Sequence, residues 1–153
     1  MCIRDSILTG CPLRISAREE AAEDIVATVI EYINKRDSEG LIALFCEEVK
    51  ENYELTADVD ILFNMFDGEI TSYEVSAVAS GEKSELFGKS SYNIRAIVEA
   101  YVDDKEYRIE VSKTIYNDQK PQRVGITTVM AKDVNVKGMF FVGEVNVFTY
   151  GRR

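Results

Sequence analysis

Aspartates and tyrosines are the side chains of this chain best suited to proton transfer, because the sequence contains no histidine. A carboxyl group facing an apolar pocket beside a tyrosine donor is an arrangement that isomerases use. Three aspartates, Asp58, Asp60 and Asp67, lie on or near one predicted helix and could supply the base. For Asp58 and Asp60 the alternative is a structural role, because a helix dipole favours acids in its first turn.

Other common chemistries lack the residues they need. The absence of histidine removes the commonest general acid–base group and the commonest metal ligand. Cys2, Cys11 and Cys46 do not have the paired spacing of a zinc site or a disulfide framework. Cys46, with no histidine to activate it, is expected to be a small buried hydrophobe. No glycine-rich nucleotide motif, Walker loop or zinc-protease motif occurs. We therefore predict no catalytic residue, no metal and no cofactor.

Cys11 is the cysteine with a recognisable context. The segment Ile7-Leu8-Thr9-Gly10-Cys11 resembles the lipobox of bacterial lipoproteins, in which an apolar residue and small residues precede a cysteine. In such proteins the thiol receives a diacylglycerol and a peptidase then cuts before the cysteine. The resemblance implies that Cys11 is a lipid-attachment site. It also implies an extracytoplasmic protein, held on the cell membrane by its lipid.

The residues before the lipobox do not form a secretory signal. Such a signal needs a basic region and about 7–15 apolar residues, and Met1–Ser6 supplies neither. Back-translation of this hexapeptide resembles a transposase end sequence used in preparing DNA libraries. We infer an adapter-derived start, so that residues 1–16 combine this start, a lipobox remnant and a tether, and residues 17–150 form a single domain. The alternative is a genuine cytoplasmic start with a chance lipobox match.

Composition narrows the classes of partner. The net charge is −9, and an acidic surface repels nucleic acid and anionic lipid headgroups. No run of about 20 apolar residues is present to span a membrane. We therefore expect no nucleic-acid partner, and contact with a membrane only through a lipid anchor.

Apolar residues at helical spacing predict three helices in the first half of the chain. Ser16–Glu19 has the form of a capping box, which predicts a first helix over residues 17–35. Asp37 is a suitable cap for a second helix to about Val49. Thr56 caps a third, which Gly68 is expected to end.

The apolar period then changes to two, which indicates strands. The predicted strands cover residues 70–78, 92–102, 107–115, 124–130 and 140–150, with loops or turns at 81–88, 103–105 and 117–121. Segregated helices and strands indicate an α+β fold, in which three N-terminal helices pack on one face of a curved, mostly antiparallel sheet.

The helical segment resembles two known families. Residues 35–45, Lys-Arg-Asp-Ser-Glu-Gly-Leu-Ile-Ala-Leu-Phe, are similar to the place where helix one turns into helix two in the NTF2-like, cone-shaped superfamily. Residues 66–74 are similar to a family of small lipoproteins of unknown function, mainly from Gram-positive gut bacteria. The first resemblance implies a conical cavity between the helices and the sheet.

Strand parity predicts which side chains line that cavity. Apolar residues at alternate positions of the second and third strands should face the helices, and Arg95, Glu99, Arg108 and Glu110 should share the opposite face. The candidate pocket residues are Tyr73, Tyr92, Tyr107 and Phe66. For the tyrosines, the alternative is a place in the core with the hydroxyl at its rim.

Three functions fit these expectations. The first is a non-catalytic envelope lipoprotein domain that binds a small apolar ligand or a protein partner. The second is an isomerase- or dehydratase-type enzyme that uses the tyrosine-lined cone. The third is a homodimer formed through the outer sheet face, where Ile97, Tyr101 and Val129 are expected to lie among polar neighbours.

Overall fold

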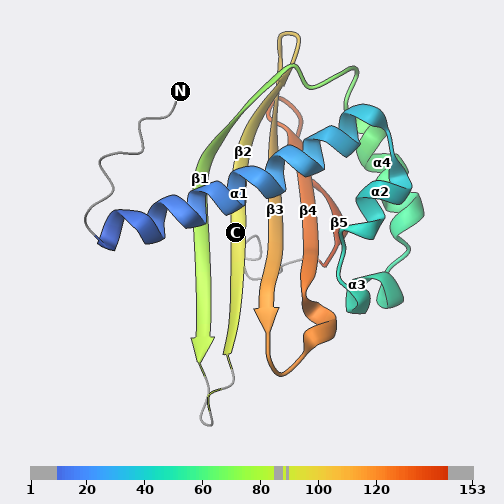
Figure 1. The fold of residues 1–153 in the computed structure, drawn as a ribbon. Coiled ribbons are helices and arrows are strands. Elements are labelled where there is room, and N and C mark those ends of the chain that lie inside the picture. Colours follow the sequence, from blue (N-terminus) through green and yellow to red (C-terminus); the bar gives the residue numbers. More distant parts are fainter. Residues whose placement is uncertain (1–9, 85–87, 89, 145–153) are drawn as a thin grey trace.

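Helices cover one face of a five-stranded antiparallel sheet. The computed structural model describes residues 10–84, 88 and 90–144, and side chains from residue 17 onward. Within that part, four α-helices precede the strands, and one 3-10 turn lies between the third and fourth strands. The sheet is open, in the order β1-β2-β3-β4-β5 (Figure 1). The predicted α+β class is confirmed, with four helices in place of three.

Helix α1 (Gly10–Lys35) presents one apolar stripe to the sheet. The stripe consists of Ala22, Val26, Val29, Ile30 and Ile33, all buried at helical spacing. The helix begins at Gly10, so the prediction that Ser16–Glu19 starts it is wrong. Pro12 does not prevent this early start. The N–H groups in the first turn of a helix have no partner within the helix, so a proline there removes no helical hydrogen bond.

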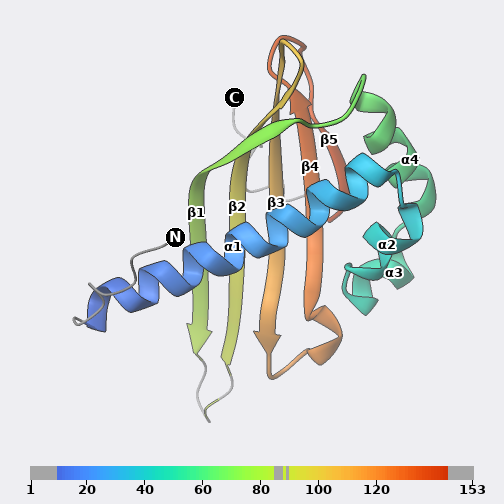
Figure 2. The same ribbon diagram turned by 45° about the horizontal axis from the view of Figure 1, so that its top comes forward.

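The path of α1 decides which strands it covers. The helix crosses the sheet diagonally, passing over β1, β2, β3 and β4 in turn toward the helices at the far edge (Figures 1 and 2). Near its C-terminus, the side chain of Asn34 donates to the carbonyl of Ile70 at 3.0 Å and accepts from its N–H at 2.8 Å. This pair ties the end of α1 to the segment that enters β1.

The predicted second helix is two helices. Helix α2 (Ser38–Ala43) begins where Asp37 accepts a hydrogen bond from the N–H of Gly40 at 2.9 Å, as its cap prediction requires. The chain then leaves the helical path before α3 (Glu47–Asn52). The interruption arises because Ile126 bonds this segment through both its backbone groups. Its carbonyl accepts from the N–H of Cys46, and its N–H donates to Leu44, each at 2.9 Å.

Helix α4 (Leu55–Met65) starts and stops at different residues from those predicted. Thr56 lies inside its first turn, and Gly68 does not adopt the left-handed backbone of a glycine cap. Instead, Arg36 donates from Nη1 to the carbonyl of Phe63 at 2.9 Å, and from Nη2 to that of Phe66 at 3.1 Å. A cation at the C-terminal end of a helix binds its unpaired carbonyl groups and complements its dipole.

The strands form a meander in which each pairs with the next. Their bounds are β1 Ser72–Ser84, β2 Ser90–Val102, β3 Lys105–Asn117, β4 Gly125–Asp133 and β5 Phe140–Gly143, with the 3-10 turn η1 at Pro121–Arg123. The tight turn at residues 103–105 is confirmed. The expected loop at 81–88 starts later, because β1 pairs with β2 as far as Ser84. The predicted last strand ends at Gly143 in the described part, and its residues 145–150 lie outside that part.

Three β-bulges change which side chains face the helices. The register shifts place one extra residue in β1 at Ser76, in β3 at Ile115 and in β4 at Thr127. A bulge reverses the alternation of side chains beyond it. Met130 therefore pairs opposite Glu110 on the outer face, whereas Val129 pairs opposite Val111 and is buried in the core. The expectation that Val129 lies on the outer face is wrong for this reason.

The junction of α2, α3 and β4 depends on Gly125. This residue has φ of +132°, and an added Cβ would lie 2.9 Å from the backbone nitrogen of Cys46. We predict that Gly125→Ala lowers the free energy of unfolding by about 2 kcal/mol or more, because the left-handed backbone and the backbone clash act together. Urea denaturation measures this loss. Gly81→Ala is the control, since its Cβ would meet nothing within 4 Å, and an equal loss there would contradict the argument.

Candidate functional site

The four candidate pocket residues separate into different environments. Phe66 and Tyr107 pack against each other with ring centroids 4.8 Å apart, and both are almost fully buried. Burial also raises the pKa of Tyr107 above its usual value. These two rings therefore belong to the core that joins the α4 end to β3.

Tyr73 and Tyr92 lie away from that pair. Tyr73 is 41% exposed on the edge strand β1. Tyr92 stacks on Tyr116, with ring centroids 5.9 Å apart, where the start of β2 pairs with the end of β3. The candidate residues therefore do not surround one common hollow, and any ligand contact by them stays a prediction.

Asp58 and Asp60 lie apart from the buried tyrosine, whereas Asp67 lies near it, and its charge adds to the burial that raises the pKa of Tyr107. Asp58 occupies the first turn of α4, and Asp60 is exposed. Asp67 is exposed and pairs with Lys105 at the β2–β3 turn. A carboxylate–tyrosine contact does occur where Tyr116 donates to Glu82 at 3.2 Å, but both side chains are exposed. None of these groups faces an enclosed apolar space.

A small hollow remains between α1 and the sheet. Its volume is about 170 Å³, and its lining is Asp24, Ile25, Thr28, Leu44, Lys113 and Ile126. This is the place where the NTF2-like resemblance puts a conical cavity. Sites for small molecules are commonly 300–1,000 Å³, so this hollow is below the usual size.

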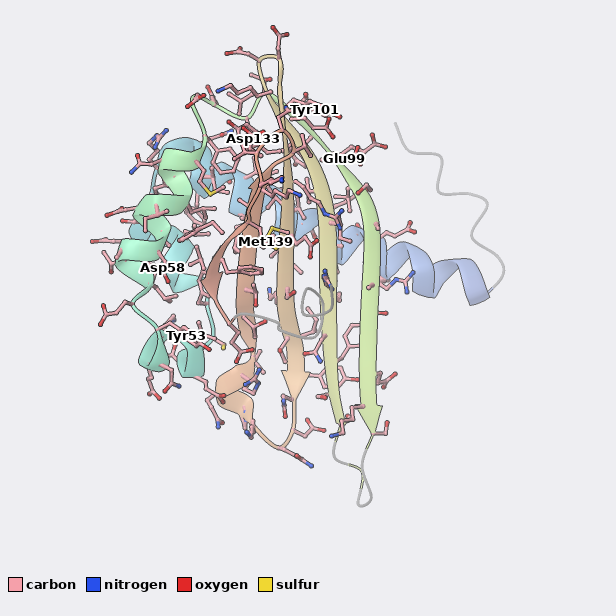
Figure 3. The ribbon with its side chains drawn as sticks, turned by 180° about the vertical axis from the view of Figure 1, so that it is seen from behind. Tyr53, Asp58, Glu99, Tyr101, Asp133 and Met139 are labelled. Atoms are coloured by element: carbon pink, nitrogen blue, oxygen red, sulfur yellow. The ribbon has the colours of Figure 1, made fainter. Side chains whose placement is uncertain are left out.

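A larger pocket opens toward the face of the sheet that α1 does not cover. Its volume is about 390 Å³, and it is lined by Ala79, Ser80, Gly81, Asn93, Ile94, Arg95, Ser112, Lys113, Thr114, Arg123, Thr127 and Glu144. Figure 3 shows this outer face, where Glu99 and Tyr101 also lie. The lining combines hydroxyl, amide and guanidinium groups with apolar surface. We take this outer-face pocket as the candidate functional site.

Two of the three bulges lie at the outer-face pocket. The bulge at Ile115 follows Thr114, whose hydroxyl donates to Oδ1 of Asn93 at 2.8 Å. The bulge at Thr127 places that residue itself in the lining. Bulges re-aim side chains and occur often beside functional sites. Here they bring polar groups of β2, β3 and β4 together at one place.

Two arginines, Arg95 and Arg123, lie in the pocket lining, although the chain as a whole has a net charge of −9. Among the described lining residues they are accompanied by one carboxylate, Glu144. The side chain of Lys113 lies on the helix-covered face instead, because Lys113 pairs with the buried Ile94 and Ile126 and lines the hollow beside α1. Each of the two arginines is held by a carboxylate, Arg95 by Glu110 and Arg123 by Glu144. Guanidinium groups bind other oxyanions through the same directed hydrogen bonds. The arrangement is therefore suited to a polar ligand that carries negative charge.

Arg123 joins three segments at the pocket wall. From η1, its Nη1 donates to Oε1 of Glu48 in α3 at 2.7 Å, and its Nη2 donates to Oε2 of Glu144 at 3.0 Å. Burial acts against the charge of Arg123, but the ion pairs with Glu144 and Glu48 outweigh it and raise its pKa. The guanidinium is thus charged and fixed in direction.

Glu110 organises the outer face beside the pocket. It is only 4% exposed, although it lies on the face opposite the helices. Arg95 contacts its Oε2 through Nε at 2.9 Å and through Nη2, and Arg108 contacts Oε1 through Nε at 3.1 Å and Nη2 at 3.0 Å. The sequence predicted that these charges share one face, and the cross-strand register confirms it.

Other sequence-based candidates have simple places in the fold. Cys46 is buried and unpaired at the start of α3. Cys11 lies in the first turn of α1, and its side chain is outside the described part. Among the described residues, no group of three or more acidic or cysteine side chains is placed to hold a metal ion. No helix in the same part is long and apolar enough to cross a membrane.

The buried ion group has a measurable effect on stability. We predict that Glu110→Ala lowers the free energy of unfolding by about 2–3 kcal/mol, because it leaves Arg95 and Arg108 without their shared carboxylate. Urea denaturation monitored by circular dichroism gives the value. Glu99→Ala on the same face is the control and should cost less than about 1 kcal/mol. Equal losses in the two variants would remove Glu110 from its organising role.

Comparison with known proteins identifies the family. Residues 28–137, which are more than half of the chain, match the domain of unknown function DUF5104. The matched segment contains the pocket-lining residues except Glu144. A search of curated proteins found no match. This chain therefore belongs to the DUF5104 family, whose function is not known.

Proposed function

We propose that this chain is a non-catalytic binding domain of a cell-envelope lipoprotein and that it holds a small polar ligand in the outer-face pocket. The observation that carries the proposal is the pocket itself, a hollow of about 390 Å³ with hydroxyl, amide and guanidinium groups in its lining. This volume is within the usual range for small-molecule sites. Hydroxyl and amide groups of Asn93, Ser112 and Thr127 would orient the ligand.

The pocket changes the kind of ligand that the sequence favoured. An apolar ligand was expected in a cone between helices and sheet. The hollow in that place is only about 170 Å³, and large apolar side chains fill the space around it. The outer-face pocket offers polar groups instead, which favour a ligand able to form hydrogen bonds.

The proposal of an extracytoplasmic, lipid-anchored location rests on the lipobox-like segment before Cys11. Since α1 begins at Gly10, a lipid on Cys11 would lead directly into a helix rather than through an extended tether. Two or three acyl chains, at about 0.8 kcal/mol per buried methylene, suffice for stable anchoring. Kinship with the NTF2-like superfamily is part of the same proposal, supported by the α+β arrangement.

The enzymatic alternative has less support. It requires a carboxylate inside an apolar cavity beside a tyrosine. Tyr107 is buried against Phe66. The carboxylates of Asp67, near Tyr107, and of Glu82, at Tyr116, are both exposed. A dimer through the outer face also has limited support. Ile97 and Tyr101 are half-buried, and each is an isolated apolar side chain among charged neighbours.

Filling the pocket should abolish ligand binding. Ala79 lines the pocket from β1, and its side chain is exposed on the outer face opposite Arg95. We predict that Ala79→Leu weakens binding of any polar solute found by thermal-shift screening by about tenfold or more, because the added methyl groups occupy the ligand's space. Isothermal titration calorimetry measures the change.

Ala77→Leu provides the matched control. Ala77 is exposed on the same face two residues earlier in β1, opposite Ile97, and does not line the pocket. Binding should be unchanged in this variant. If both substitutions weaken binding equally, or if a broad screen of polar solutes finds no ligand, the proposed binding site is refuted.

The proposed location has its own test. In the natural parent protein, whose upstream sequence must first be recovered, Cys11→Ser is expected to abolish incorporation of a clickable fatty acid and to release the protein from the membrane fraction. Cys46→Ser is the control, because that thiol is buried in the fold. A parent gene without a basic and apolar segment before Leu8, or labelling that persists in Cys11→Ser, would show that Cys11 is not the anchor.

A further inference from the structure

The ion pair between Arg123 and Glu144 is part of the wall of the outer-face pocket. Both side chains line the pocket, and their nitrogen and oxygen atoms are 3.0 Å apart. Of the lining residues that the structure describes, Glu144 is the one carboxylate, and Arg95 is the other outer-face cation. A carboxylate in this position has the chemistry that a bound anion would have.

The backbone holds Glu144 at this place. Its N–H donates to the carbonyl of Thr127 at 2.9 Å, and its carbonyl accepts from the hydroxyl of Thr128 at 2.8 Å. The preceding Gly143 has φ of +88°, and an added Cβ would lie 2.4 Å from the carbonyl oxygen of Thr127. The chain therefore turns closely against β4, and the Glu144 side chain leaves a fixed point to reach Arg123.

Arg123 has a second partner that does not depend on Glu144. Its Nη1 donates to Glu48 at 2.7 Å from the other side, where α3 begins. Glu48 does not line the pocket. If the Glu144 carboxylate moved away, the ion pair with Glu48 would still hold the guanidinium plane beside the pocket. Nη2 would then be available to an incoming anion.

We propose that the pocket selects a small oxyanion, a carboxylate or a phosphate, which replaces the Glu144 side chain on Arg123. Glu144 is then a built-in competitor that occupies the cation in the absence of ligand. The inference rests on the proposed function, because it assigns the chemical class of the ligand in the same pocket. Guanidinium groups bind both kinds of oxyanion through directed, charge-assisted hydrogen bonds.

Competition by Glu144 determines in which direction each substitution should change the affinity for an anion. The ligand must displace an existing ion pair, so the observed affinity is lower than the affinity of the vacant guanidinium. Removing the charge of Glu144 while keeping its shape should strengthen anion binding. Removing the charge of Arg123 should weaken it. A purely structural ion pair would not move anion affinity in these opposite directions.

The probes are inorganic phosphate and succinate, titrated calorimetrically into the whole chain at low ionic strength. Glu144→Gln is expected to tighten binding by about fivefold or more, and Arg123→Gln to weaken it by about tenfold or more, because each change alters a charge-assisted contact. Melting curves should be recorded for each variant. If Arg123→Gln fails to fold, Arg123→Lys replaces it, with a smaller expected loss because lysine lacks the planar fork.

Asp67 and Lys105 supply the matched controls. They form an exposed ion pair at the opposite end of β3 from the pocket. Asp67→Asn and Lys105→Gln change the net charge as Glu144→Gln and Arg123→Gln do, so equal effects would mean that anions respond only to total charge. That result would overturn the inference, as would a Glu144→Gln variant that binds no more tightly.

The two proposals can fail separately. If neutral polar solutes bind and Ala79→Leu abolishes their binding, while phosphate and succinate do not bind, the proposed function holds and the oxyanion inference falls. If neither neutral nor anionic solutes bind, both are refuted. Tighter anion binding by Glu144→Gln, with unchanged binding by Asp67→Asn, supports both.

Discussion

The need to bury one entire face of a five-stranded meander shapes the rest of this molecule. Helix α1 crosses the sheet diagonally from β1 to β4, and the shorter helices lie at the β4–β5 edge (Figure 1). Between them, aliphatic and aromatic side chains fill the helix-side layer. Close packing of this kind is what stabilises a domain of this size. It also leaves little room for a ligand between the helices and the sheet, so polar chemistry is directed to the opposite face.

On that opposite face, the irregularities of the sheet matter more than its regular parts. A regular meander would distribute polar side chains evenly along alternate positions. The extra residues at Ile115 and Thr127 break this pattern beside the outer-face pocket. The carbonyl of Thr127 also accepts a hydrogen bond from the backbone N–H of Glu144, and this places the Glu144 carboxylate at the pocket wall. The same local distortions therefore shape the hollow and supply part of its lining.

Regular periodicity made much of the fold predictable. The stripe of α1, the cap at Asp37 and the alternation along β2 follow from local rules that act over a few residues. The predictions failed where a distant segment intervened. The second helix is interrupted because Ile126 bonds Leu44 and Cys46 across the chain. Helix α4 ends where Arg36 binds the carbonyls of Phe63 and Phe66.

The candidate site was less predictable for the same reason. The sequence placed Arg95 and Glu110 on one face of the sheet, and this followed from parity alone. It did not indicate the pocket, because Arg123, Thr127 and Glu144 meet only through a bulge and a 3-10 turn. The available signal was indirect. Gly125 and Gly143 lie next to the residues that line the pocket, and both have left-handed backbones that a sequence pattern of strands does not require.

The ion pairs of Arg123 connect the helices to the outer-face pocket. The same guanidinium contacts Glu48 in α3 and Glu144 beyond β5, so it joins the helical edge of the fold to the outer-face pocket. An arginine used only for stability gains little from such a position, because ion pairs of half-exposed groups contribute modestly. An arginine that binds a ligand benefits from two carboxylate partners, because one partner orients the guanidinium group while the ligand replaces the other. That division between an orienting partner and an exchangeable partner is what makes this pocket a credible binding site rather than a surface irregularity.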